Sequence, residues 1–214
     1  MYKRMRRENL FLSFIVALFA GIVMFFTACN SCSKDKAPAD EQTTDTAVVS
    51  TDLVVENVIS TNRQDMYMKY GGDYTWFETC IVLKDFIDAE ESDGTVTGIS
   101  NVFQVINNNN ESYDVHVLLY STTADTTAVD EKIGFWVEDL PLNEEEIKVT
   151  FADAYDRLMR ANIVKPHSRQ VVLRKQLGPV DTNPQYIFGN AQAQVYVDAT
   201  TGDVSAKNPV FPNE

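Results

Sequence analysis

Residues Tyr74 to Ile87 read YTWFETCIVLKDFI, and this aromatic and β-branched run decides the fold class. Residues of these types are enriched in β-strands. Asp93-Gly94 follows as a hairpin turn, and Thr95 to Ile106 then predicts a returning strand. The stretch therefore predicts a β-hairpin.

Two further strands are expected after this hairpin. Asn107 to Asn110 indicates a loop, and Tyr113 to Tyr120 predicts the third strand. Thr122 to Asp130 is polar and typical of turns, whereas Lys132 to Glu138, KIGFWVE, predicts the fourth strand. Strands joined by short polar turns indicate an antiparallel sheet, and such a sheet needs a helix to cover one face.

Helices are expected before and after these strands. A short helix is predicted from Thr61, a capping residue, to the glycine stop at Gly71-Gly72. The apolar residues from Leu53 to Ile59 fit a strand and a short helix equally well. The clearest helix has Thr150 as its N-cap and ends before Pro166. Helical spacing places four of its residues on one face: Phe151, Ala154, Tyr155 and Leu158.

The last part of the chain is again strand-like. Arg169 to Leu177, Tyr186 to Phe188 and Gln192 to Asp198 predict three strands, and Thr201-Gly202-Asp203 predicts the turn after them. The fold class predicted for the whole chain is α+β, with antiparallel sheet packed against one or two helices.

This C-terminal part resembles the PepSY module, a small α+β unit of bacterial secreted and membrane proteins. The resemblance covers Glu146 to Ala206 and is carried by six residues: Tyr196, Val197, Asp198, Thr201, Gly202 and Val204. Gly202 permits a positive φ, and Asp198 can accept hydrogen bonds from the turn. The insert from Gly178 to Pro184 departs from the family pattern. The resemblance implies a non-catalytic, inhibitory or regulatory module, and the order of elements around Tyr67 to Asp93 leaves open two such units in tandem.

The N-terminal stretch indicates export. Lys3 to Arg7 is cationic, Leu10 to Phe26 is almost wholly apolar, and the small residues Thr27-Ala28 precede Cys29. This pattern resembles the lipobox of bacterial lipoproteins, which implies cleavage after residue 28 and acylation of Cys29. An uncleaved membrane anchor and ordinary cleavage with release are the alternatives.

Residues 29–50 then predict a disordered tether, because they have almost no large apolar residues before Val48. The Lys and Asp residues close behind Cys29 resemble those of lipoproteins in the Bacteroides group. That resemblance implies an outer-membrane lipoprotein of the cell envelope, on its periplasmic or surface face. The expected organisation is a signal peptide (1–28), the tether (29–50), a β-rich α+β region (51–141) and a PepSY-like region (142–214).

Charge excludes one class of partner. The chain has a net charge of −13, and removal of residues 1–28 takes away four basic residues and one acidic residue, which leaves −16. Nucleic acid is therefore not expected as a partner, since phosphates require a basic surface. The acidity is typical of a protein kept in solution outside the cytoplasm.

Candidate binding residues are Tyr74 and Trp76, which belong to an aromatic group with Tyr67, Tyr70 and Phe77. Aromatic rings on a sheet could stack against sugar rings, but a small domain also needs such rings in its core. Because side chains alternate along a strand, at least one of Trp76 and Phe77 should be buried.

Catalytic, metal and cofactor sites are not predicted. His116 and His167 have no metal-ligand partners at the usual spacing, and Cys80 lies within an apolar strand. We therefore expect a non-enzymatic, lipid-anchored protein that binds or regulates a protein partner. The alternative is a surface accessory protein that binds glycan or peptide through Tyr74 and Trp76.

Overall fold

The computed structural model describes residues 53–109 and 112–212. The expected signal peptide, Cys29 and the expected tether lie outside these residues, and residues 49–214 form one compact unit. The elements in chain order are α2 (Val55–Tyr70), β1 (Tyr74–Leu83), β2 (Val96–Asn109), β3 (Ser112–Thr123), β4 (Thr127–Ile133), β5 (Asp139–Leu140), the 3-10 helix η1 (Glu144–Glu146), α3 (Phe151–Arg160), β6 (Gln170–Gln176), β7 (Gln185–Asn190), β8 (Ala193–Asp198) and β9 (Val204–Ser205).

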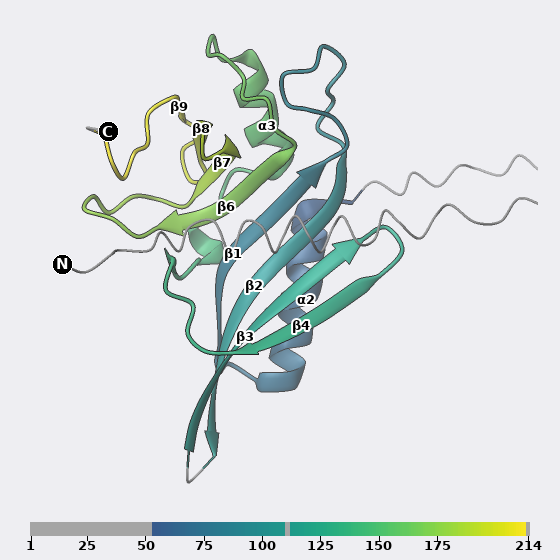
Figure 1. Cartoon of the computed structure of the whole chain (residues 1–214), viewed down its shortest axis with the longest axis vertical. Coiled ribbons are helices and arrows are strands. Elements are labelled where there is room, and N and C mark those ends of the chain that lie inside the picture. The colour runs from purple at the N-terminus through teal and green to yellow at the C-terminus, as the bar shows by residue number, and fades with distance from the viewer. Residues whose placement is uncertain (1–52, 110–111, 213–214) are drawn as a thin grey trace, which may run out of the picture. The chain divides into compact units, whose positions relative to one another are not determined.

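The strands form one antiparallel sheet in the order β4-β3-β2-β1-β6-β7-β8-β9, with β5 paired to β6 (Figure 1). The order is symmetric about the β1–β6 pair, because each half of the described chain is a helix followed by a meander of four strands. This architecture confirms the α+β prediction. The sheet is continuous across the expected boundary at residue 141, since β1 pairs with β6 from Glu78↔Arg174 to Val82↔Gln170.

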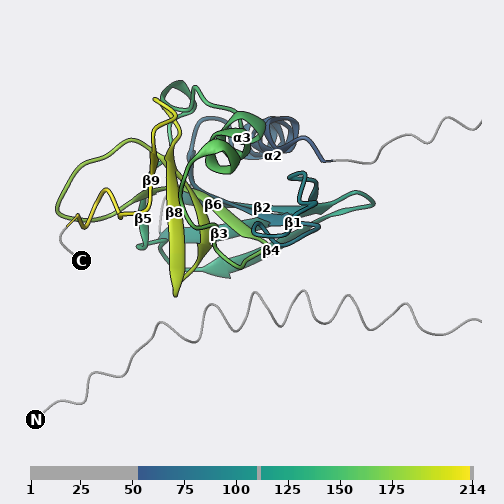
Figure 2. The same cartoon turned by 90° about the horizontal axis from the view of Figure 1, so that it is seen from above.

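Both helices cover the same face of the sheet (Figure 2). The core lies between them and the strands, where α2 buries Val55, Ile59 and Met66 and α3 buries Phe151, Ala154, Tyr155 and Leu158. On the strands, the buried set on this face includes Ile81, Phe103, Leu173 and Phe188. The predicted apolar face of α3 is confirmed, and so is its N-cap, since Thr150 Oγ1 accepts a hydrogen bond from Asp153 N at 3.1 Å.

The first helix is longer than predicted. It begins at Val55, so Thr61 is not its N-cap, and the position before it is Val54, which makes no side-chain capping bond. The reason is tertiary: Val55, Ile59, Asn62 and Met66 recur at helical spacing, and burial of this stripe outweighs the strand preference of the β-branched residues. The glycine stop is confirmed, because Gly71 has φ 63° and its N–H donates to Tyr67 O at 2.8 Å.

Two loop predictions between residues 107 and 130 were wrong. Asn107 to Asn109 continue β2 and pair with Ser112 to Asp114, so β2 and β3 extend as a two-stranded ribbon beyond the sheet (Figure 1). The expected turn from Thr122 to Asp130 contains the end of β3 and the start of β4. The fourth strand is therefore Thr127–Ile133 and not Lys132 to Glu138. Every residue of β4 is exposed, so backbone pairing with β3 forms this strand without the apolar alternation that a sequence pattern requires.

A β-bulge near the start of β1 determines which way its side chains point. The register shifts between Trp76 and Glu78, so Phe77 is an extra residue, and both Trp76 and Phe77 are buried. Beyond the bulge, Thr79 and Ile81 face the helices, whereas Glu78 faces the opposite side of the sheet. The short strand β5 pairs with the end of β6, and Leu142 N donates to Trp76 O at 2.8 Å. β5 therefore lies where β1 and β6 diverge.

Candidate functional site

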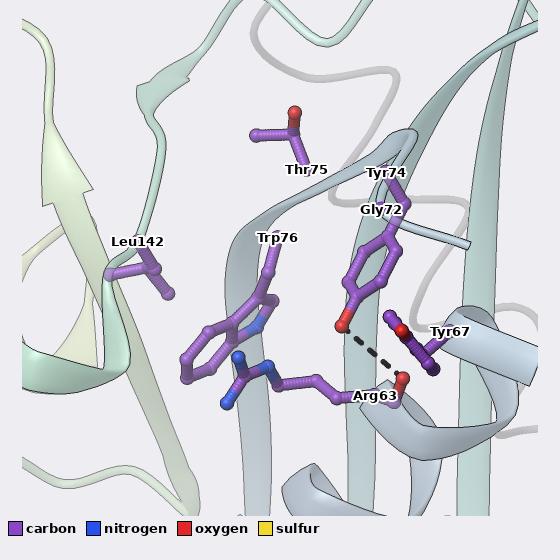
Figure 3. Close-up of a pocket in the computed structure, with 7 residues that line it drawn as sticks. All are labelled: Arg63, Tyr67, Gly72, Tyr74, Thr75, Trp76 and Leu142. Atoms are coloured by element: carbon purple, nitrogen blue, oxygen red, sulfur yellow. Dashed lines mark hydrogen bonds between the residues drawn. The ribbon is translucent and has the colours of Figure 1, made fainter. Parts of the chain in front are cut away.

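Three residues of the predicted aromatic group, Tyr67, Tyr74 and Trp76, line a hollow of about 300 Å³ between α2 and the start of β1 (Figure 3). Its lining residues are Arg63, Tyr67, Gly72, Tyr74, Thr75, Trp76 and Leu142. The volume lies at the small end of the range for ligand pockets. The structure thus brings Tyr74 and Trp76 together in one concave place.

The polar groups of these two predicted residues are already bonded within the protein. Trp76 is 4% exposed, and its Nε1 atom donates to Glu78 O and to Thr79 Oγ1 at 3.2 Å each. Tyr74 Oη donates to Arg63 O at 3.2 Å, and its ring packs edge-on against Phe103. Trp76 therefore serves the core, as the packing alternative predicted, and cannot offer a ring face to a sugar in this conformation.

Arg63 and Tyr67 form the accessible side of this hollow. The Arg63 guanidinium lies 5.7 Å from the centre of the Trp76 ring and pairs with Glu144, while Tyr67 is 62% exposed. Sequence reasoning placed Tyr67 in the aromatic group but missed Arg63. The signal that could have found it is the spacing of four residues on a predicted helix, which places both side chains on one face.

A second site lies on the sheet face opposite the helices. Glu78 and Asp139 are 7% and 6% exposed, and one guanidinium serves both. Arg174 Nη1 is 3.8 Å from Glu78 Oε2 and 3.5 Å from Asp139 Oδ1. Asp139 Oδ2 also accepts the indole N–H of Trp136 at 3.2 Å. This cluster attaches the crossover between β4 and β5 to the central strands.

The buried carboxyls hold their protons more tightly than usual. Burial, followed by the negative charge of Asp139, raises the pKa of Glu78 from its ordinary 4.5 to about 7. Burial also raises the pKa of Asp139, although the positive charge of Arg174 opposes this shift. Two carboxyls that share one cation fit best with a proton retained between them.

Cys80 is the third polar group here and is the free cysteine within the described residues. Its Sγ atom donates to Glu78 Oε1 at 3.1 Å. Burial and then the negative charge of Glu78 raise the pKa of this thiol well above its usual value. A nucleophilic cysteine needs the opposite environment, so the arrangement favours a structural role for Cys80.

The crossover itself exposes apolar side chains to solvent. Ile133, Phe135 and Val137 are 85%, 68% and 73% exposed, while Trp136 between them turns inward and donates its backbone N–H to Gln104 Oε1. These three residues, the apolar row, begin at Ile133, the last residue of β4, and continue into the segment that follows this edge strand. The sequence pattern placed all three in a predicted strand from Lys132 to Glu138, whereas the structure ends the strand at Ile133.

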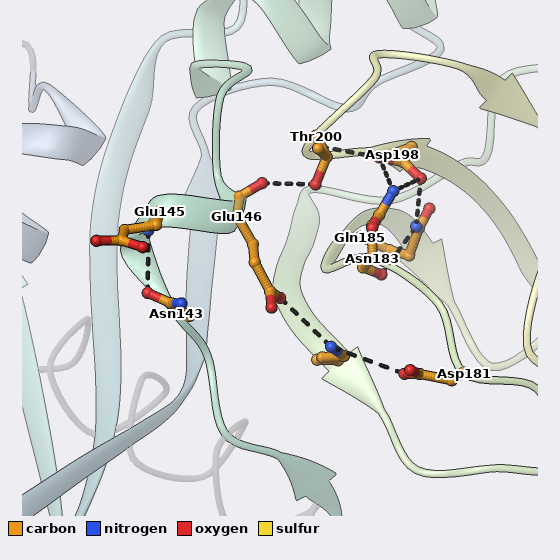
Figure 4. Close-up of polar contacts among 9 residues, drawn as sticks. Asn143, Glu145, Glu146, Asp181, Asn183, Gln185, Asp198 and Thr200 are labelled. Carbon is orange, nitrogen blue, oxygen red and sulfur yellow. Dashed lines mark hydrogen bonds and ion pairs between the residues drawn. The ribbon is translucent and has the colours of Figure 1, made fainter.

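The C-terminal turn has the geometry that its residues predicted. Asp198 Oδ1 accepts hydrogen bonds from Thr200 N and Thr201 N at 2.8 and 2.9 Å, and Gly202 has φ 81°. Asn183 and Gln185 donate side-chain amides to the same carboxylate (Figure 4). The Gly178 to Pro184 insert therefore contributes to the turn.

Metal ligation finds no support among residues 53–109 and 112–212, where no group of three or more His, Cys, Asp or Glu side chains is placed to hold an ion. His167 stacks on Phe86 at 4.1 Å and bonds to Asp88, and His116 lies 2.5 Å from Glu131.

Neither helix in the described part of the chain is long and apolar enough to cross a membrane. No protein-family model, no curated protein and no solved structure matches this chain.

Proposed function

We propose that this chain is a lipid-anchored, non-enzymatic protein of the cell envelope that binds or regulates a protein partner. The observation that carries the proposal is the apolar row, three large apolar side chains that are each more than two-thirds exposed within five residues of chain, because gathered exposed apolar side chains mark protein interaction surfaces. Ile133 ends the edge strand β4, and the segment that carries Phe135 and Val137 is attached to the sheet by Trp136 N–H, which donates to Gln104 Oε1, and by the Asp139–Arg174 ion pair. A binding surface of this kind needs no reacting group.

The experiment for partner binding is chemical crosslinking in intact cells, followed by pull-down of the chain. A Phe135→Ser/Val137→Ser variant should lose a reproducible crosslinked species. The matched control is Met68→Ser, which removes a side chain of 78% exposure from α2 and should keep that species. Equal crosslinking by both variants would contradict the proposal.

Anchoring is tested separately, at the two cysteines near the N-terminus. Acylation of Cys29 would hold the domain at a membrane surface through several acyl chains. Cys29→Ser should therefore move the protein from the membrane fraction to the soluble fraction, whereas Cys32→Ser should not. An unmodified mature N-terminus in mass spectrometry would refute the lipid anchor.

The hollow beside α2 supports a second candidate function, which is recognition of a glycan or peptide. The specific observation is that Tyr67 offers an open aromatic ring at the rim, beside the Arg63 guanidinium, which Glu144 already pairs. Because Trp76 and Tyr74 are engaged internally, binding there would depend on Tyr67. Comparison of Tyr67→Ala with Trp76→Ala separates this candidate from a purely structural role.

A further inference from the structure

The edge strand β4 is an open template for another strand. Among the strands of residues 53–109 and 112–212 it pairs with β3 alone, and all seven of its residues are exposed. Its pairing with β3 runs from Thr127 to Ile133 without a register shift. Proteins protect such edges with bulges, prolines, very short strands or charged side chains. Strand β4 has no bulge, no proline and seven residues, and its charged side chains are Asp130, Glu131 and Lys132.

The direction of the backbone groups on β4 follows from two hydrogen bonds at its ends. Gly134 N donates to Val115 O on β3, and Thr126 O accepts from Thr123 N, both at 2.8 Å. Backbone groups alternate in direction along an antiparallel strand. The backbone N–H and C=O groups of the even-numbered residues of β4 therefore point toward β3. The backbone groups of the four odd-numbered residues point outward: Thr127, Val129, Glu131 and Ile133.

Side chains around this edge indicate which residue types a strand paired with β4 should carry. Val129 is 43% exposed, Ile133 is an exposed apolar residue at the end of the strand, and Phe135 is exposed just beyond it. The segment from Asp125 to Glu138 contains four acidic residues and one lysine. A strand added here would meet apolar side chains and negative charge together, so it should carry apolar and basic residues.

A second copy of the chain fits this edge poorly. Each copy would bring the same segment, with four acidic residues against one lysine, and the same net charge of −13, so the two copies would repel each other. The charge pattern favours a different protein with the opposite sign.

We propose that β4 binds an extended segment of a protein partner, rich in alternating basic and apolar residues, by pairing with it as a further strand. Main-chain hydrogen bonds to the outward groups would supply affinity, and the apolar row and the acidic side chains would supply specificity. The inference rests on the proposed function, since it names the surface and the chemistry of that partner.

The test uses a short synthetic peptide that alternates lysine and valine, with two comparison peptides. One replaces lysine with glutamate, and the other carries a central proline that prevents strand pairing. Fluorescence polarisation on the folded chain should give at least about tenfold tighter binding for the lysine peptide than for either comparison. Hydrogen exchange should slow at the outward amides of β4, such as Val129 and Glu131, and not in α2.

Two variants locate the interaction. Val129→Pro removes an outward N–H and should weaken peptide binding about tenfold or more, whereas Val129→Thr keeps the N–H and should not. Circular dichroism checks that both variants fold. If the proline variant unfolds, Asp130→Lys/Glu131→Lys decides in its place, because it should reverse the preference between the lysine and glutamate peptides.

Equal binding of all three peptides, or slowed exchange only outside β4, would overturn the inference. Concentration-dependent dimerisation that Val129→Pro abolishes would also overturn it in favour of self-pairing. Failure of the proposed function looks different, because the crosslinked species would then be missing in cells even if the lysine peptide binds β4. A crosslinked partner that contacts only the apolar row would support the proposed function. It would overturn the inference that the partner pairs with β4 as a strand.

Discussion

Glu78 and Asp139, two buried carboxyls from strands 61 residues apart in the chain, share the guanidinium of Arg174 on the helix-free face of the sheet. Burying charged groups costs free energy, and one cation can balance only one anion. Protonation of one carboxyl removes the negative charge that Arg174 does not balance. Burial and the Asp139 charge therefore raise the pKa of Glu78 to about 7. The attachment of β5, and of the crossover before it, is therefore sensitive to pH.

Stability should fall as pH rises through this window. Between the ordinary pKa of 4.5 and the folded value of about 7, the unfolded chain releases a proton that folded Glu78 keeps. The free energy of unfolding should decrease across that range and level off above it. Urea unfolding of wild type and Glu78→Gln at about pH 5 and about pH 8 measures the effect, which should be smaller in the variant.

The control for this measurement is Glu145→Gln, which neutralises an exposed carboxylate on η1. It should retain the wild-type dependence on pH. Parallel profiles for wild type and Glu78→Gln would show that Glu78 does not titrate in this range.

Removal of the shared cation should destabilise the protein strongly. Arg174→Met leaves two buried carboxyls without a counter-ion, a change that costs about 3–5 kcal/mol in comparable buried pairs. Arg160→Met removes an exposed partner of Asp156 and should cost less than about 1 kcal/mol. Chemical unfolding of both variants at neutral pH gives the comparison, and similar losses would mean that the buried cluster contributes little.

The cluster also shows why sequence reasoning found the fold class but not this site. Strand patterns correctly indicated β1 and β6, and the capping residue Thr150 correctly indicated α3. No local pattern says that Glu78 and Arg174 become neighbours, because that depends on the pairing of strands from opposite halves of the chain. The bulge at Phe77 adds a reversal of direction that simple alternation does not contain.

The wrong predictions have a common physical origin. β4 and the far ends of β2 and β3 are held by backbone pairing, so their side chains need not be apolar. Conversely, Phe135 and Val137 are apolar but exposed. A sequence pattern treats apolar residues of this kind as part of a strand, so it placed both in the predicted fourth strand. The sequence grouped Tyr74 and Trp76 as aromatic candidates, but neither the hollow that they line nor the internal bonding of their polar atoms follows from a local pattern.

Two aromatic residues of the hollow beside α2 should differ strongly in how much they contribute to stability. Trp76→Ala removes a buried indole and should cost about 3–5 kcal/mol of stability. Tyr67→Ala removes a largely exposed ring and should change stability by less than about 0.5 kcal/mol. Thermal unfolding measures both changes. Loss of glycan retention in Tyr67→Ala, with the fold intact, would support the second candidate function, and unchanged retention would refute it.

The turn that carries the PepSY resemblance depends on Gly202 for two separate reasons. Its φ of 81° strains any residue with a Cβ atom, and an added Cβ would lie 2.4 Å from Arg157 Cζ. Arg157 Nη1 also donates to Gly202 O at 3.2 Å. Gly202→Ala should therefore cost about 1–3 kcal/mol from the backbone, plus the displacement of the guanidinium. Gly72→Ala, which has open space around it and an ordinary φ, is the control.

A double-mutant cycle with Arg157→Ala separates these two contributions. If the guanidinium carries part of the cost, the double variant should be more stable than the sum of the single changes predicts, because the added Cβ then meets no side chain. If the backbone carries all of it, the two losses should add. Urea unfolding of the four proteins decides between these outcomes. Coupling close to zero would mean that Arg157 moves aside freely and that the turn alone requires glycine.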